Sequence, residues 1–358
     1  MKKLKIFHLI TLSELGGAQT VMANLANKLA KKHDVTVLAG EGDGQMFALL
    51  DSKIRKIHIP LLKRAISPVS DLRTFLALRR LYKQYRPDII HLHSSKAGVL
   101  GRLAFPPDKI IYTVHGFDSI RRVYRRFLPL ERLLQHRCRA VVAVSRYDVK
   151  SLREERIMHN IFCVPNGVKP QKRTLKSFNL PPNFKKKILC IARVPNPEKK
   201  LKKGRTAFVK RFDLFFKTAK LLPEYAFIWI GNQKPLKDPP PNIFCLGVLP
   251  YAESYNQLAD VFMLPTNYEG MPMSVLEAQY FGLPVVASNV SGLNELVING
   301  ENGYTAANAA AAFAKKIKYI LEHPAVHQKF SRSAKAHFQQ NFTAEKMVNG
   351  YLKIYNLI

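Results

Sequence analysis

The segment NYEGMPMSVLEAQYFGLPVVAS (residues 267–288) decides the fold of this chain. It follows the apolar run VFMLP and contains a Gly-Met-Pro turn, a stretch with helical spacing and a second apolar run, LPVVAS. Gly282 and Pro284 end the helical stretch. A strand, a turn, a helix and another strand in this order form the repeating unit of a parallel α/β sheet. Two carboxylates lie eight residues apart, Glu269 at the end of the strand and Glu277 inside the helix.

The same alternation extends outward from this segment through both halves of the chain. The expected strands are short, β-branched and apolar on both faces, as the covered strands of a parallel sheet must be. A segment rich in Lys, Pro and Asn, at about 169–186, separates the two runs and is expected to be a linker. The sequence therefore predicts two doubly wound α/β domains that face each other across a cleft, with boundaries at 1–170 and 171–340. The expected strands are LKIFHLI, DVTVLAG, IRKIHIP, DIIHLHS, KIIYTVHG, AVVAVS and IFCVPNG, then KKILCIAR, YAFIWIG, NIFCLG, VFMLP and LPVVAS.

Charge is the strongest compositional signal. The 358 residues include 57 Lys and Arg against 25 Asp and Glu, a net charge of +32, which favours a polyanionic partner. No apolar run reaches the roughly 20 residues of a membrane span, and the basic N-terminus lacks a signal-peptide cleavage site, so neither is expected. The widely spaced cysteines indicate buried thiols in a reducing cytosol. They are Cys138, Cys163, Cys190 and Cys245.

Ligands of doubly wound sheets bind at the carboxyl ends of the strands, so the residues that follow each strand are the candidates. Arg193 follows a strand, and Lys210 precedes an expected helix; together they could clamp a diphosphate, although both could equally be solvated charges. Gly16 and Gly17 can adopt positive φ and let the backbone approach an anion at a helix start. His115 ends a strand before Gly116. His91 and His93 share one face of a strand, but no acidic residues accompany them, so a metal site is not expected there.

The segment 267–288 offers a complementary set of groups. Glu269 lies on the loop after the strand, and the turn formed by Gly270, Met271 and Pro272 leads into a helix start that can meet a phosphate. A carboxylate accepts hydrogen bonds from two hydroxyl groups, so a glutamate here suits a ribose or a hexose.

These motifs resemble the retaining glycosyltransferases of family 4, whose E-x7-E signature matches Glu269 and Glu277. Further matches follow in order along nearly the whole chain: GGAQTVMANLANKLA, DIIHLHS, VHG, VPNGV, IAR…KRFDLF, IGN and VSGLNELVINGENGY. The resemblance implies a GT-B fold of two Rossmann-like domains. The N-terminal domain, 1–170, would bind the acceptor, and the domain at 171–340 would bind the nucleotide-sugar. Residues 341–358 resemble the helix that packs back on the first domain.

The resemblance also implies a role for each matching residue. Glu277 would bind the ribose, Glu269 would contact the transferred sugar, and His115 would face the sugar and the reacting centre. Arg193 and Lys210 would bind the diphosphate and stabilise the leaving group. No Asp-rich motif is present, so neither a metal nor another cofactor is expected. The other implied donor-binding positions are Gly16, Gly17, Gly231, Gly270, Met271 and Pro272.

The chain departs from the family pattern in the spacing of the cation pair. Sixteen residues separate Arg193 from Lys210, many more than is usual in the family, whereas Lys199 has the more usual spacing. Lys210 has the better following context, KRFDLF, although Arg211 replaces the usual glycine. We favour Lys210 and interpret residues 194–209 as an inserted basic loop.

The expected activity is the transfer, with retention, of a hexose or N-acetylhexosamine from a nucleotide-diphosphate sugar. UDP is the nucleotide that we favour. The expected acceptor is a lipid-linked or polysaccharide glycan of the cell envelope. Catalysis would depend on orientation and on stabilisation of the departing diphosphate. Three alternatives remain: a GT-B nucleotide-sugar epimerase, a basic nucleic-acid-binding protein, for which no recognition motif is found, and a non-catalytic homologue.

Residues 121–139, RRVYRRFLPLERLLQHRCR, interleave arginines with large apolar side chains. Such a segment can lie at an anionic lipid surface. We therefore predict a cytoplasmic protein attached peripherally to the inner face of the cell membrane. The alternative is that the leucines are core residues and the arginines are merely solvated. The predicted contact residues are Arg121, Arg122, Arg125 and Arg126.

Overall fold

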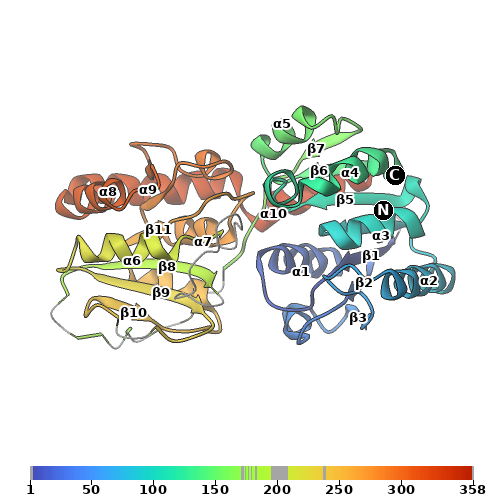
Figure 1. Ribbon diagram of the computed structural model, residues 1–358, viewed down its shortest axis with the longest axis horizontal. Helices are drawn as coiled ribbons and strands as arrows, with labels where there is room; N and C mark the ends of the chain where they lie inside the picture. Colours follow the sequence, from blue (N-terminus) through green and yellow to red (C-terminus); the bar gives the residue numbers. More distant parts are fainter. Residues whose placement is uncertain are drawn as a thin grey trace. The chain divides into compact units, whose positions relative to one another are not determined.

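The computed structural model describes residues 3–170, 173, 175, 177–178, 180–181, 184–194, 209–236 and 239–356. The chain forms two compact units (Figure 1). Unit 1 comprises Met1–Gly167 together with Ala344–Ile358, and unit 2 comprises Val168–Thr343. The units therefore change at 167/168 and 343/344, where the sequence placed boundaries at 170 and 341. In the described part of the chain, no helix has both the length and the apolar character needed to cross a membrane.

Unit 1 is built on a seven-stranded sheet with the order β3-β2-β1-β4-β5-β6-β7, and every pairing in it is parallel. Its strands are β1 (Lys5–Ile10), β2 (Asp34–Ala39), β3 (Arg55–His58), β4 (Ile89–His93), β5 (Ile110–Val114), β6 (Ala140–Ala143) and β7 (Ile161–Cys163). Its helices are α1 (Gly17–Leu29), α2 (Pro68–Tyr85), α3 (Ser95–Ala104), α4 (Leu128–Leu134), α5 (Arg146–Glu154) and α10 (Ala344–Tyr355). The last helix, red in Figure 1, thus completes the unit that the first strand begins.

Unit 2 repeats the architecture with a six-stranded parallel sheet in the order β10-β9-β8-β11-β12-β13. Its strands are β8 (Lys187–Val194), β9 (Ala226–Asn232), β10 (Ile243–Cys245), β11 (Val261–Leu264), β12 (Val285–Ser288) and β13 (Gly303–Ala306). Its helices are α6 (Phe212–Lys220), α7 (Met273–Phe281), α8 (Ala310–Glu322) and α9 (Pro324–Asn341). The predicted fold class, two doubly wound α/β domains of the GT-B type, is confirmed.

The two faces of the sheet in unit 1 differ in chemistry. Side chains alternate along a strand, so Phe7, Leu9, Ile90 and Leu92 share one face, where they join the main apolar core. The opposite face carries a group that we call the histidine seam. Its members are His8, His91, His93 and Thr113 on the central strands, His115 just after β5, and Tyr351 and Tyr355 on α10.

The histidine seam contains two hydrogen-bonded groups, which meet where the rings of His91 and His93 lie against each other. His8 Nδ1 lies 3.0 Å from His93 Nε2, and His93 Nδ1 lies 3.1 Å from His115 Nε2. His91 reaches the hydroxyls of Tyr355 and Thr113, each at 2.7 Å. Thr113 Oγ1 lies 3.1 Å from the hydroxyl of Tyr351. These contacts tie α10 to the centre of the sheet.

Burial keeps these imidazoles neutral. It lowers the pKa of His8 to about 3 and that of His115 to about 4, and it holds the pKa of His91 and His93 well below the usual value. A neutral imidazole has one donor and one acceptor, which is what a chain of ring-to-ring hydrogen bonds requires. His8, His91 and His93 also bring one ring nitrogen each within 4.8 Å of one another, a spacing that could hold a metal ion. Because His91 uses both of its nitrogens on hydroxyl groups, hydrogen bonding accounts for its burial.

We predict that His8 makes the protein sensitive to acid. The pKa of His8 is lower in the folded state than in the unfolded chain, so the unfolded chain binds more protons between about pH 3 and 6.5. Stability therefore falls as the pH drops through this window, by up to about 1.4 kcal/mol per pH unit for one group. His8→Gln should reduce that slope, measured by urea unfolding between pH 4.5 and 7. His323→Gln, at an exposed histidine, is the control; equal slopes in both variants would contradict the prediction.

Candidate active site

The best-defined cluster of predicted residues lies in unit 2, where β11 ends. Glu269 follows β11 and forms an ion pair with Lys210, the residue two positions before α6. Both side chains are largely buried, with 11% and 21% of their surfaces exposed. The structure therefore brings together two of the residues that the sequence singled out, 59 positions apart.

Backbone contacts fix Lys210 in this place. Lys210 forms an isolated antiparallel bridge with Thr266. The N–H of Asn267 and the hydroxyl of Thr266 both donate to the carbonyl of Val209, each at 2.9 Å. The N–H of Arg211 donates to Pro265 O, also at 2.9 Å. The segment around Lys210 is thus paired with the loop that carries Glu269. Lys199, the alternative partner of Arg193, lies outside the described residues.

The turn that follows Glu269 leads into α7. Pro272 is the N-cap of this helix and no side chain caps it. The first N–H groups of a helix have no partner within it, and they carry the positive end of the helix dipole, so such an end attracts anions. Pro272 itself has no N–H, so its predicted contribution to an anion site cannot be a backbone hydrogen bond. Met271 is buried and anchors the turn.

Glu277 lies on α7, partly buried. Within the described part of the chain its carboxylate makes no hydrogen bond and no ion pair. The pKa of Glu277 is raised to about 8, mainly because burial disfavours the charged form and also because Glu253 is negatively charged. An acceptor group that is held in a desolvated position without a partner is suited to receive the hydroxyls of a ligand.

Gly292, which was not among the residues predicted from the sequence, packs against the backbone of the turn. Its φ is +77°, a conformation that favours glycine. A Cβ at this position would lie 1.9 Å from the carbonyl oxygen of Gly270 and 2.7 Å from that of Glu269. The glycine therefore allows the loop after β12 to pack directly on the backbone of the turn. The motif VSGLNELV contains the signal, but only the structure shows what this glycine touches.

Two further predicted positions lie at the ends of β8 and β9. Arg193 is exposed near the end of β8. The indole N–H of Trp229 donates to Ala192 O at 2.9 Å and holds this end of the strand. Gly231 has φ +114°, and a Cβ there would lie 2.5 Å from Ala192 O, so close strand packing accounts for this glycine. Its N–H already donates to Gly247 O. Of the expected inserted loop at 194–209, residues 195–208 lie outside the described residues.

In unit 1 the predicted glycines precede a helix. Gly16 is the N-cap of α1 and Gly17 is its first residue. The expectation of positive φ is wrong for both: Gly16 is extended, with φ −177°, and Gly17 has ordinary helical geometry. The turn is made instead by residues 11–15, so the glycines serve the start of the helix. Gly116, after β5, does have positive φ, at +104°.

His115 is the end of the histidine seam nearest to the carboxyl edge of the sheet. Its Nε2 is bonded to His93, and its buried Nδ1 has no hydrogen-bond partner among the described residues. A neighbouring feature escaped the sequence analysis. Ser94 has φ +116°, strained for a residue with a side chain, and its hydroxyl lies 2.7 Å from Thr11 Oγ1. This contact joins the ends of β1 and β4.

The arginines predicted to contact a membrane are mostly engaged within unit 1. Arg121 pairs with Glu154 at 2.7 Å and with Glu155 at 3.4 Å, and Arg125 pairs with Glu155 at 3.3 Å. Arg122 pairs with Asp118 at 3.0 Å. The guanidinium of Arg126 lies over the ring of Phe127.

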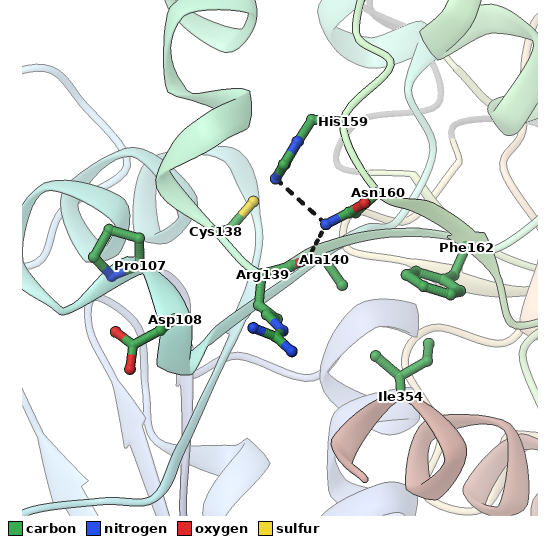
Figure 2. A pocket seen from close by; sticks show the side chains of 9 residues that line it. All are labelled: Pro107, Asp108, Cys138, Arg139, Ala140, His159, Asn160, Phe162 and Ile354. Carbon is green, nitrogen blue, oxygen red and sulfur yellow. Dashed lines mark hydrogen bonds between the residues drawn. The ribbon is translucent and has the colours of Figure 1, made fainter. Parts of the chain in front are cut away.

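A cavity of about 420 Å³ in unit 1 lies away from these residues. Figure 2 shows its lining, with Asn160 donating to Arg139 O and lying within reach of His159. Residues just before β5, β6 and β7 form much of it, so it lies at the amino edge of the sheet, opposite to His115. Doubly wound sheets bind their ligands at the other edge, and we do not assign this cavity to the site.

Comparisons with known proteins identify the family of the chain. Residues 15–172 match the model of Glycosyltransferase Family 4, and residues 185–337 match that of Glycosyl transferases group 1. The chain is 30% identical over 331 residues to the UDP-Gal:alpha-D-GlcNAc-diphosphoundecaprenol alpha-1,3-galactosyltransferase of Escherichia coli, with 84% of each chain covered. It is 24% identical to the capsular polysaccharide biosynthesis glycosyltransferase CapM of Staphylococcus aureus, with 99% of each covered.

Solved structures show the same fold at low sequence identity. Anabaena Alr3699/HepE, solved in complex with UDP and glucose, superposes with a TM-score of 0.78 at 17% identity, covering 99% of this chain and 100% of that one. The sucrose-phosphate synthase of Thermosynechococcus elongatus superposes with a TM-score of 0.80 at 18% identity, with 99% of each chain covered. On the family models and the relative that is 30% identical, this chain belongs to the family 4 glycosyltransferases.

Proposed function

We propose that the protein transfers a hexose or N-acetylhexosamine, with retention and without a metal, from a UDP-sugar to a lipid-linked or polysaccharide acceptor of the cell envelope. The Escherichia coli relative is named for transfer from UDP-Gal to a diphosphoundecaprenol-linked sugar, and the Staphylococcus aureus relative for capsule synthesis. The observation that carries the proposal is the cluster in unit 2, where the ion pair between Lys210 and Glu269, the start of α7 and the unpartnered carboxyl group of Glu277 follow the end of β11.

Each part of the cluster suits one part of a nucleotide-sugar. Glu277 would accept hydrogen bonds from the ribose hydroxyls, and Glu269 from the transferred sugar. Lys210, together with Arg193, would neutralise the diphosphate, and the start of α7 would supply N–H groups to it. Lys210 is held by Glu269 before any ligand arrives, so its ammonium group is already oriented, which lowers the cost of reorganisation when negative charge develops.

The reaction breaks the bond between the anomeric carbon and the phosphate oxygen and forms a bond from that carbon to the acceptor oxygen. The proton of the acceptor hydroxyl ends on the leaving phosphate, so the step needs no external acid. Its barrier falls mainly through orientation and through cationic stabilisation of the UDP that leaves. His115 is neutral at physiological pH and would act as a hydrogen-bonding group toward the sugar, not as a cation.

The product of the reaction tests this proposal. The protein is incubated with UDP-, GDP- and ADP-hexoses and a diphosphate-lipid-linked sugar, and the product linkage is determined by NMR. We expect UDP release that depends on the acceptor, a product that keeps the donor's anomeric configuration, and a rate unchanged by EDTA. UDP release without acceptor, together with a free epimerised sugar, would favour the epimerase. Loss of activity in EDTA with recovery in Mn²⁺ would exclude the metal-independent mechanism.

Glu277→Gln should weaken UDP binding while stabilising the free protein at alkaline pH. Above pH 8, where the Glu277 carboxyl is ionised, loss of a charge-assisted hydrogen bond costs roughly 1.5–3 kcal/mol, or about ten- to 150-fold in affinity. The folded pKa of about 8 exceeds the unfolded value, so the native state binds more protons between about pH 4.5 and 8, and stability falls as the pH rises through that window. The variant should lack this decline in thermal melts, whereas Glu301→Gln, at an exposed carboxylate, should keep it. Unchanged UDP affinity would refute the assignment to the ribose.

Gly292→Ala should reduce turnover by about 100-fold, because the added methyl group displaces the turn that carries Glu269 and Gly270. Gly300→Ala is a matched control. Gly300 has nearly the same φ, +79°, but a Cβ there meets nothing within 4 Å. Both variants place a side chain at a similar positive φ, and contact with the turn distinguishes Gly292→Ala from the control in a kinetic assay. Equal losses of activity would show that strain, and not contact with the turn, is responsible.

A further inference from the structure

Helix α2 has an exposed apolar stripe. Val69, Leu72 and Leu76 are 63%, 61% and 53% exposed, and Ile66, just before the helix, is 61% exposed. Their spacing of three to four residues places them on one side of the helix. Single exposed apolar residues are common on protein surfaces, but four in one stripe are not expected without a purpose.

The opposite side of α2 already anchors the helix to unit 1. Thr74 and Leu78 are fully buried, and Phe75, Leu81 and Tyr82 pack against the apolar core. The exposed stripe is therefore not a core face left open by loose packing. It is a second apolar surface on a helix whose core contacts are complete.

Cations flank the stripe. Arg73, Arg79, Arg80 and Lys83 are all exposed, and none of them forms an ion pair with another described residue. Helical spacing places them beside the stripe. The helix has one acidic residue, Asp71, and this carboxylate is engaged with Lys96 at 2.6 Å, with less than a fifth of its surface exposed. The exposed side of α2 thus combines large apolar side chains with uncompensated positive charge.

Compared with α2, the segment 121–139 has less uncompensated positive charge and fewer exposed apolar side chains. Arg121, Arg122 and Arg125 are paired with acidic residues that offset their charge. Leu128 and Leu134 are buried, so they belong to the core, although Leu133 is 72% exposed. Of the two basic regions considered in unit 1, α2 is the better match to a lipid surface.

We infer that the exposed side of α2 is the surface by which the protein docks on an anionic lipid bilayer. Val69, Leu72 and Leu76 would enter the interface, and the long basic side chains would reach the headgroups. A second copy of the chain is a poorer occupant, because a two-fold contact would set the same four cations against each other. The inference rests on the lipid-linked acceptor of the proposed function, which lies in a bilayer, and names the surface that would meet that bilayer.

Binding to vesicles tests this assignment, with the full chain and with UDP binding followed in parallel by thermal shift. The vesicles contain phosphatidylcholine alone or mixed with phosphatidylglycerol. Three variants each remove four positive charges, from +32 to +28, so that net charge cannot explain a difference. The α2 set is Arg73, Arg79, Arg80 and Lys83→Ser, the rival set is Arg121, Arg122, Arg125 and Arg126→Ser, and the control set is Lys217, Lys220, Lys315 and Lys318→Ser.

We expect the α2 set to reduce partitioning onto the anionic vesicles at least tenfold, while the other two sets reduce it no more than threefold. A separate variant, Leu72→Gln with Leu76→Gln, keeps every charge. It should bind at low salt but be released at moderate salt at which the wild type still binds, because its attachment is then electrostatic alone. UDP binding should persist in all variants, so its loss would count against the donor site and not against the docking surface.

Three outcomes would overturn the inference. The first is binding of the α2 set at the level of the control set, and the second is a loss of binding in the rival set as large as that in the α2 set. The third is a Leu72 and Leu76 variant that binds vesicles like the wild type but converts a dimer to a monomer in light scattering, which would make the stripe an interface between copies.

Discussion

The carboxyl edge of a parallel sheet is the constraint on which the rest of this structure depends. Parallel strands need helices on both faces, so the faces are filled and only the edges remain for ligands. Each unit obeys this rule. In unit 2 the loop after β11 carries Glu269 to the start of α7, and in unit 1 the loop after β5 carries His115 and Gly116. The chemistry of the protein is therefore concentrated in a few residues that follow buried strands.

Much of this was predictable from the sequence, because strand periodicity and the residues after each strand are local signals. The strands and the helix that contains Glu277 came from patterns within short windows. The comparisons confirm the family and the fold. The individual roles of Glu269, Glu277, Arg193 and His115 stay predictions, since they depend on a ligand.

The features that the sequence did not predict arise from contacts between distant segments. Gly292 matters because of where its Cβ would fall on the backbone of Gly270, and nothing in its own window reveals that. The positive charge of 121–125 is offset largely by Glu154 and Glu155, about thirty residues downstream. The neutrality of the histidines results from burial beneath α10, a helix more than two hundred residues away. The φ of Gly16 was misjudged because a glycine permits positive φ without requiring it.

The hydrogen bond between His91 and Tyr355 joins residues 264 positions apart. This separation affects how the protein folds while it is being synthesised on the ribosome. Unit 1 begins with the first strand but is completed by the last helix. A nascent chain that has already emerged through β7 still exposes a row of polar imidazoles where α10 will lie. Unit 2 is contiguous and can fold as soon as its own residues are made, so the domain translated second has the earlier opportunity to finish. A ribosome that stalls before α10 is translated would hold a chain with one complete domain and one open one, and quality control would meet that open domain in the first half of the chain.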